Sequence, residues 1–175
     1  MNLANWLTLL RLCIVPLVIA AISQHQFGLA LAGFVIAGLT DALDGYVARA
    51  YNQTTELGAL LDPLADKSLL MSIYVTLGIL GIIPSWLAII VVARDLMIMG
   101  AVILSWLLAN PMEIRPILIS KANTLAQILF AAYKLGTLAF GAELPAVDMA
   151  LIVLVSLTTA TSMVAYLRGW LRHMS

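Results

Sequence analysis

The chain has 175 residues, of which 63% are hydrophobic and only 10% are charged. Soluble domains carry about 25% charged residues, so this composition excludes an ordinary soluble domain and indicates an integral membrane protein. Its nine basic residues equal its nine acidic residues in number, so no excess of positive charge points to a nucleic-acid partner.

Six apolar stretches follow one another along the chain, each close to the ~20 residues that a helix needs to cross a bilayer. No internal repeat or long linker divides them, so we expect one membrane domain over residues 1–175. The first stretch is interpreted as a span rather than a signal peptide, because it lacks a basic leading segment and contains Arg11. We predict an all-α integral membrane protein with six transmembrane helices, at Trp6–Ile22, Phe27–Val47, Leu60–Leu80, Ser85–Leu108, Ile117–Phe140 and Ala146–Trp170.

The basic residues are distributed unevenly between the two ends of these stretches. The loops after the first, third and fifth stretches contain no lysine or arginine. The other connections and the C-terminal tail contain Arg49, Arg115, Lys121, Arg168 and Arg172. By the positive-inside rule, both chain ends and the segment Asp41–Asp66 face the cytoplasm. Lys134 lies well inside the fifth stretch, and we interpret it as a lysine that snorkels toward the outer face.

Four carboxylates are concentrated in one short segment of this apolar chain. Asp41 and Asp44 are three residues apart at the end of the second stretch, so they share a helical face. Gly58, Asp62 and Asp66 recur every four residues on the next helix, which runs in the opposite direction. A carboxylate at the membrane centre costs roughly 2.5–3.5 kcal/mol, so four of them need compensation. Clustered carboxylate oxygens suit divalent cations, and four negative charges suffice for two such ions.

Small and basic residues accompany these carboxylates. Gly45 and Ala48 continue the first acidic face and leave room for a bulky polar ligand against the backbone, while Arg49 could neutralise a phosphate oxygen. The structural alternative is that the aspartates cap helices or pair with Arg49 and Lys67. Two basic residues cannot balance four acids, so the sequence favours a metal site.

This segment resembles the signature of the CDP-alcohol phosphatidyltransferases, Asp-x2-Asp-Gly-x2-Ala-Arg-x8-Gly-x3-Asp-x3-Asp. Every fixed position is matched, by Asp41, Asp44, Gly45, Ala48, Arg49, Gly58, Asp62 and Asp66. The resemblance implies transfer of a phosphatidyl group from CDP-diacylglycerol to an alcohol, with release of CMP. It also implies a pair of Mg²⁺ or Mn²⁺ ions bound by the four aspartates, and a homodimer.

The resemblance also assigns roles to single residues. Asp66, the last residue of the motif, resembles the family's general base, which takes the proton from the acceptor hydroxyl. The CDP-diacylglycerol site would be formed by Gly45, Ala48, Arg49 and Gly58. Asn5 and Thr8, near the start of the first stretch, are candidate contacts to the CDP moiety. A hydrogen bond between packed helices is an equally good interpretation of both.

Two later stretches bear on the acceptor alcohol. The Arg-Asp at Arg94 and Asp95 resembles the cardiolipin synthases of this family, whereas the phosphatidylglycerophosphate synthases more often have Gly-Arg-Glu. The stretch Arg115–Gln127 resembles the cardiolipin branch as well. We therefore expect phosphatidylglycerol as the acceptor, with glycerol 3-phosphate as the alternative.

Three basic residues are candidate contacts to the acceptor's phosphate. Arg94 lies midway along the fourth stretch, where a cation is costly unless it faces a polar cavity or ligand. Adjacent residues on a helix do not face each other, so we expect no pairing between Arg94 and Asp95. Lys121 could reach the same phosphate or be an interfacial lysine, and Arg115 is a weaker third candidate.

A divalent-cation transporter is the competing class, because acidic clusters also form ion pathways. Such a pathway distributes carboxylates through the membrane depth, whereas here all four lie near one face. The accompanying Gly45, Arg49 and Gly58 are not required by an ion pathway. The sequence therefore favours an enzyme.

Overall fold

A computed structural model describes residues 3–51, 56–107 and 118–174, and within these it describes the side chains of residues 13–40, 67–101, 104 and 118–171. The described residues form helices and short turns without a β-strand. The six helices are α1 (Leu3–Ser23), α2 (Phe27–Tyr51), α3 (Glu56–Ile79), α4 (Ser85–Leu107), α5 (Leu118–Phe140) and α6 (Pro145–Met174). The prediction of an all-α fold with six helices is confirmed, and each expected stretch coincides with one helix.

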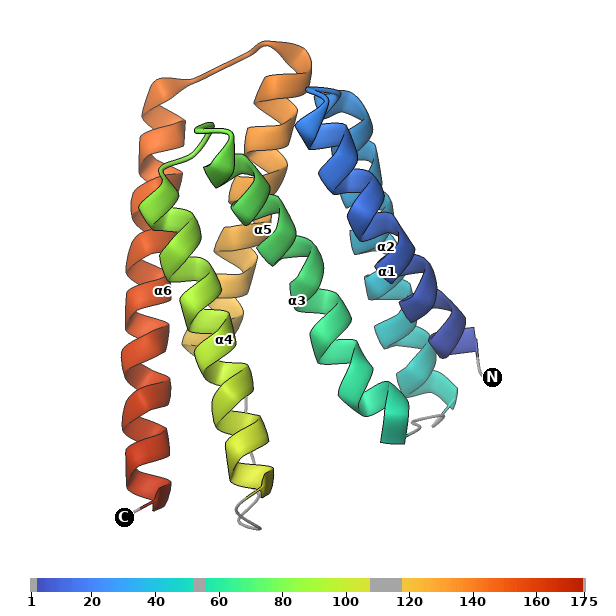
Figure 1. The fold of residues 1–175 in the computed structure, drawn as a ribbon, viewed down its shortest axis with the longest axis vertical. Helices are drawn as coiled ribbons and strands as arrows, with labels where there is room; N and C mark the ends of the chain where they lie inside the picture. The colour runs from blue at the N-terminus through green and yellow to red at the C-terminus, as the bar shows by residue number, and fades with distance from the viewer. Residues whose placement is uncertain (1–2, 52–55, 108–117, 175) are drawn as a thin grey trace.

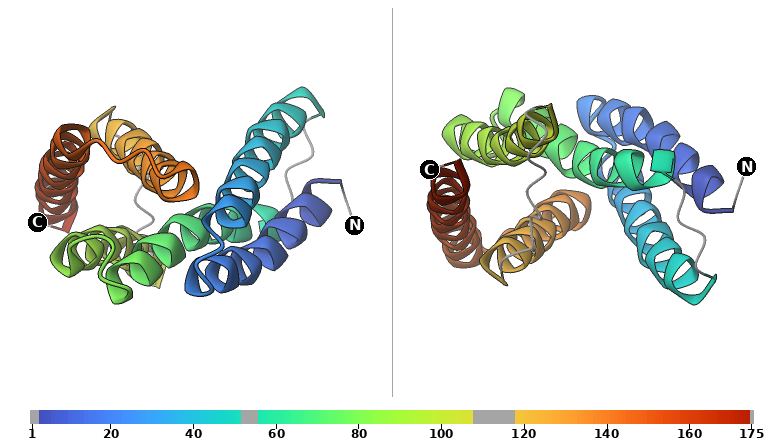
Figure 2. Two further views of the ribbon diagram at one scale, coloured as in Figure 1. Left: turned by 90° about the horizontal axis from the view of Figure 1, so that it is seen from above. Right: turned by 90° about the horizontal axis from the view of Figure 1, so that it is seen from below.

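The helices run alternately up and down, so both chain ends lie toward the lower end of the bundle in Figure 1. The α1–α2, α3–α4 and α5–α6 turns lie at the upper end. Seen along the bundle in Figure 2, α1 and α2 lie on one side, α4 and α6 on the other, and α3 and α5 between them. Accordingly, α3 packs on α1 and α4, and α5 packs on α2 and α6.

The core is formed by apolar side chains from all six helices, including Val18, Ile22, Tyr74, Phe130 and Val155. Large apolar side chains also cover much of the outside, as the exposed Leu17, Ile79, Ile89, Phe140 and Leu157 illustrate. Among the residues whose side chains are described, Pro145–Leu171 is long and apolar enough to cross a membrane, judged by length and composition.

The helices of the bundle approach closely where small residues meet. At Gly78 of α3, an added Cβ atom would lie 2.9 Å from the Cβ atom of Ala88 in α4. Small residues permit such close packing of membrane helices. The α3–α4 turn that follows contains Gly81 with a φ of 70°, and the amide of Ile82 donates to the carbonyl of Leu77. This left-handed residue closes α3 in a conformation that favours glycine.

Candidate active site

The aspartates of the motif lie on two consecutive helices. Asp41 and Asp44 are in the C-terminal half of α2, and Asp62 and Asp66 are in the N-terminal half of α3. Only four residues separate these helices, a link that spans at most about 18 Å, so both acidic segments belong to the lower end of the bundle (Figure 1). The side chains of the four aspartates lie outside the described part of the structure, so their metal site stays a prediction. Their all-oxygen donor set fits Mg²⁺ or Mn²⁺.

The backbone places the other motif residues in the same region. On α2 and α3 these are Gly45, Ala48, Arg49 and Gly58. The first turns of α1 carry Asn5 and Thr8, and α1 begins at the same end of the bundle (Figure 1). The side chains of all six lie outside the described residues, as does the whole of Arg115. Their assigned roles therefore stay predictions.

Arg94 is the centre of a polar cluster inside the bundle. Its side chain is only 1% exposed, and its guanidinium lies over the ring of Tyr166, 5.7 Å from the centroid. The Nε and Nη2 atoms donate to the Ser162 hydroxyl of α6 at 3.1 and 2.8 Å, and Nη2 also donates to the Ser120 hydroxyl of α5. One arginine of α4 therefore connects two further helices.

Arg94 also pairs with its chain neighbour, contrary to the expectation from the sequence. Its Nη1 atom donates to Oδ1 of Asp95 at 2.6 Å. The prediction that these adjacent residues do not pair was wrong. The rule that adjacent helix residues do not face each other describes only the directions in which their Cβ atoms point. A long arginine side chain can turn back around the helix, and a buried cation and carboxylate gain more by pairing than by staying apart.

Lys67 joins the same cluster from α3. Its Nζ atom donates to Oδ1 of Asp95 at 2.7 Å, so that one carboxylate oxygen accepts from two cations. The sequence offered Lys67 as a partner of the motif aspartates, whose side chains lie outside the described part of the structure; among the described residues it pairs with Asp95. Since Lys67 directly follows Asp66, the pair ties the helix turn that carries the expected general base to α4. We call Lys67, Arg94, Asp95, Ser120 and Ser162 the Arg94 cluster.

No hydrogen bond or ion pair among the described residues joins Lys121 or Lys134 to this cluster. Lys121 is exposed in the first turns of α5, next to Ser120. Lys134, nearer the other end of α5, is buried and donates to Oδ1 of Asp148 in α6 at 2.9 Å. Lys134 therefore has an ion-pair partner that the sequence interpretation did not include.

Sequence reasoning missed the serines and threonines that join α5 to α6. Asn123, fully buried, accepts hydrogen bonds from Thr158 and Thr159 at 2.9 Å each. The Arg94 partners Ser120 and Ser162 come from the same two regions. Both regions stand out in the sequence as short polar runs, Ser-Lys-Ala-Asn-Thr and Thr-Thr-Ala-Thr-Ser, inside apolar stretches. This contrast was the available signal, because polar residues inside membrane helices need partners.

Comparison with known proteins agrees with the motif. A family model described as CDP-alcohol phosphatidyltransferase matches residues 1–164. The chain belongs to the CDP-alcohol phosphatidyltransferase family. The resemblance seen in the motif is thereby confirmed, and it extends over nearly the whole length of the chain.

Relatives in this family carry two names. The human cardiolipin synthase (CMP-forming) is 34% identical over 155 residues, covering 79% of this chain and 52% of that protein. The probable cardiolipin synthase (CMP-forming) of Drosophila melanogaster is 32% identical over 190 residues, covering 99% and 58%. A probable phosphatidylglycerophosphate synthase of Mycobacterium tuberculosis is 43% identical over 101 residues, covering 54% and 48%. The chain spans about half the length of these curated relatives.

Proposed function

We propose that the protein is a cardiolipin synthase that transfers the phosphatidyl group of CDP-diacylglycerol to phosphatidylglycerol and releases CMP. The observation that carries this proposal is the extent of the similarity. Relatives named cardiolipin synthase (CMP-forming) match 79% and 99% of the chain, so the similarity reaches beyond the motif into the later helices. Those helices carry the Arg94 cluster and most of the stretch Arg115–Gln127, which resembles the cardiolipin branch.

Transfer to glycerol 3-phosphate is the second candidate function. The probable phosphatidylglycerophosphate synthase shares the higher identity, 43%, although its match covers only 54% of the chain. A high identity over about half the chain fits conservation of chemistry that both branches share. The CMP-release assay described below distinguishes the two acceptors.

We propose that all six helices span the membrane, with the motif at the cytoplasmic side. The shortest, α1 with 21 residues, is about 32 Å long, which matches the roughly 30 Å hydrocarbon core of a bilayer. Large apolar side chains face outward on several helices. The chain ends and the motif share one end of the bundle (Figure 1), the end whose connections carry most of the arginines. The homodimer implied by the family also stays a proposal.

The proposed reaction joins the acceptor hydroxyl to the phosphorus of the phosphatidyl group. The bond from that phosphorus to the bridging oxygen breaks, and CMP leaves. Asp41, Asp44, Asp62 and Asp66 would hold two Mg²⁺ or Mn²⁺ ions, which when bound supply Lewis-acid polarisation of the phosphate oxygens. Asp66 would accept the proton of the attacking hydroxyl.

The Arg94 cluster supports binding of an anionic acceptor near this chemistry. Lys67 and Arg94 share the single carboxylate of Asp95, so these three side chains retain one net positive charge. Among the described residues, the other hydrogen-bond partners of the guanidinium are the neutral hydroxyls of Ser120 and Ser162, which a phosphate oxygen can replace at low electrostatic cost. This arrangement is consistent with the expected role of Arg94 at the acceptor's phosphate.

A CMP-release assay tests the proposal. Purified protein with Mg²⁺ and CDP-diacylglycerol is expected to release CMP with phosphatidylglycerol and to form cardiolipin, identified by mass spectrometry. Asp66→Asn is expected to abolish release, because its amide cannot accept the proton. Phosphatidylglycerophosphate formed from glycerol 3-phosphate, with no product from phosphatidylglycerol, would establish the second candidate instead. A lack of CMP with either acceptor would contradict both.

A further inference from the structure

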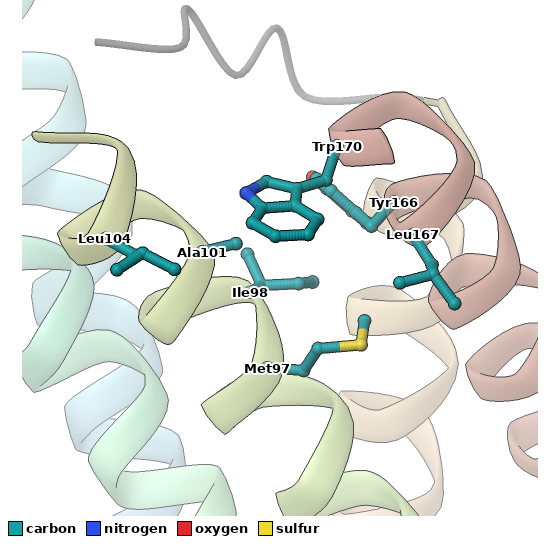
Figure 3. Close-up of a pocket in the computed structure, with 7 residues that line it drawn as sticks. All are labelled: Met97, Ile98, Ala101, Leu104, Tyr166, Leu167 and Trp170. Carbon is teal, nitrogen blue, oxygen red and sulfur yellow. The ribbon is translucent and has the colours of Figure 1, made fainter. Parts of the chain in front are cut away.

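An apolar groove runs between α4 and α6, on the side of the bundle opposite α1 and α2 (Figure 2). It encloses about 210 Å³. Pockets for drug-sized ligands measure about 300–1,000 Å³, so this volume suits a single hydrocarbon chain rather than a nucleotide or a whole lipid. The groove is lined by Met97, Ile98, Ala101, Leu104, Tyr166, Leu167 and Trp170, which Figure 3 shows projecting from the two helices.

The chemistry of the lining favours an acyl chain with an ester group at its end. The side chains are apolar apart from the tyrosine hydroxyl and the indole N–H. The indole Nε1 atom of Trp170 is buried and has no hydrogen-bond partner among the described residues. Figure 3 shows the indole lying across the groove, with its nitrogen toward Ala101 and Leu104. A buried, unpartnered N–H is costly, and an ester carbonyl of a lipid would satisfy it.

The groove adjoins the Arg94 cluster. Tyr166 forms part of its wall, and the ring of the same residue lies under the Arg94 guanidinium at 5.7 Å. Along α4 the groove begins at Met97, one turn from Arg94, and continues toward the end of the helix that lies at the lower end of the bundle (Figure 1). An acyl chain whose ester lies at the Trp170 indole would enter from this lower end and run toward Tyr166, so that its headgroup stays at the end of the bundle that carries the motif.

We infer that this groove binds one acyl chain of the acceptor lipid and so selects a phospholipid acceptor over a water-soluble one. The inference rests on the proposed function. The acceptor is favoured over CDP-diacylglycerol because the α2 part of the motif lies across the bundle from α4 and α6 (Figure 2). A donor nucleotide held there leaves the α4–α6 side to the second lipid.

The test compares two alanine-to-phenylalanine variants. Ala101→Phe fills the groove, whereas Ala160→Phe adds the same ring to an exposed position of α6 outside the groove lining. Ala101→Phe is expected to raise KM for dioleoyl-phosphatidylglycerol about tenfold, since apolar pockets discriminate by about that factor for small steric changes. KM for CDP-diacylglycerol is expected to change less than twofold. With dihexanoyl-phosphatidylglycerol, whose chains are short, the effect should fall below threefold. Ala160→Phe should change neither constant.

Trp170→Phe provides a second variant, which keeps an aromatic ring but removes the N–H donor together with part of the indole. Loss of one hydrogen bond of about 1 kcal/mol corresponds to a roughly fivefold higher KM for dioleoyl-phosphatidylglycerol. If Ala101→Phe fails to fold, the KM of Trp170→Phe for dioleoyl-phosphatidylglycerol tests the groove inference instead. A phosphatidylglycerol with a diazirine in its acyl chain should label peptides of α4 and α6 that line the groove.

The outcomes separate the two proposals. If the unmodified protein forms no cardiolipin, the proposed function fails before the groove is tested. If cardiolipin forms but Ala101→Phe and Trp170→Phe leave KM for the lipid acceptor unchanged, the groove inference is overturned alone. Labelling confined to other helices would overturn it too. If Ala101→Phe converts a dimer into monomers, a second copy of the chain covers the groove, and the inference is wrong.

Discussion

Asp95→Asn is the substitution most sharply predicted by the structure. Asp95 is 2% exposed, and its Oδ1 atom is the only carboxylate oxygen that the described residues place against Arg94. Asparagine has nearly the same shape and keeps one carbonyl acceptor, so the change removes charge without creating a cavity. Of the partners that the described residues supply, Arg94 would keep only neutral ones, while the more exposed Lys67 could turn toward solvent.

The magnitude follows from the kind of contact that is lost. Removing one partner of a buried ion pair costs about 3–5 kcal/mol, because the other charge stays buried and uncompensated. An interhelical hydrogen bond in a membrane bundle contributes only about 0.6 kcal/mol on average. Ser162→Ala should therefore cost far less, although Ser162 accepts two of the arginine's hydrogen bonds. Asp148→Asn removes the partner of the buried Lys134, but Asp148 itself is partly exposed near the start of α6, where the ammonium can extend toward water, so the cost should be smaller than for Asp95→Asn.

The assay is reversible unfolding of the purified protein in mixed micelles with increasing SDS, followed by circular dichroism. Asp95→Asn should be the least stable of the three variants, and less stable than Ser162→Ala by at least about 2 kcal/mol, given the costs above. The double variant with Arg94→Gln should recover part of the loss, because it removes the stranded charge. If Asp95→Asn is no less stable than Asp148→Asn, the buried ion pair does not stabilise the bundle and the reasoning is refuted.

Three further predictions concern helix contacts, turns and metal. Gly78→Ala should cost about 1–3 kcal/mol in the same assay, because its Cβ atom would lie 2.9 Å from that of Ala88. Gly38→Ala is the control and should be neutral or stabilising, because its added Cβ atom meets no atom within 4 Å. Equal stabilities of the two variants would contradict the close α3–α4 contact. Gly81→Ala should cost about 1–2 kcal/mol purely through its φ of 70°, since nothing lies within 4 Å of the added atom, and an unchanged unfolding midpoint would show that the turn relaxes. EDTA should abolish CMP release and Mg²⁺ or Mn²⁺ should restore it, while turnover that survives exhaustive chelation would contradict the metal prediction.

The sequence predicted the number of helices well and their ends less well. Hydropathy located each stretch because apolar length is a strong signal in a chain with few charges. The ends differ where polar residues extend a helix: α2 continues past the predicted Val47 to Tyr51, and α3 begins at Glu56 rather than Leu60. Both extensions belong to the motif region, where charged residues lower the hydropathy without interrupting the helix.

The residues of the motif could be found from the sequence, and their metal chemistry stays a prediction, whereas the pairings of Arg94 could not be found. The carboxylates at Asp41 and Asp66 stand out because they are costly in apolar surroundings. The partners of Arg94 depend on how α4, α5 and α6 are arranged, and spacing along one helix does not contain that information. A rule for neighbouring positions even gave the wrong answer for Asp95, because it ignores the reach of an arginine side chain.

The pairing of Arg94 with Asp95 also has a consequence for how the chain enters the membrane during synthesis. An arginine or an aspartate at the centre of an inserting helix each costs about 2.5–3.5 kcal/mol on insertion scales. The hydroxyl partners Ser120 and Ser162 belong to helices that are translated after α4. Asp95, being the next residue, is present from the start, so α4 can partition into lipid with its cation already neutralised. The charge of Arg94, which contributes to contacts among α3, α4, α5 and α6 in the folded bundle, thus enters the membrane on a helix that supplies its own counter-ion.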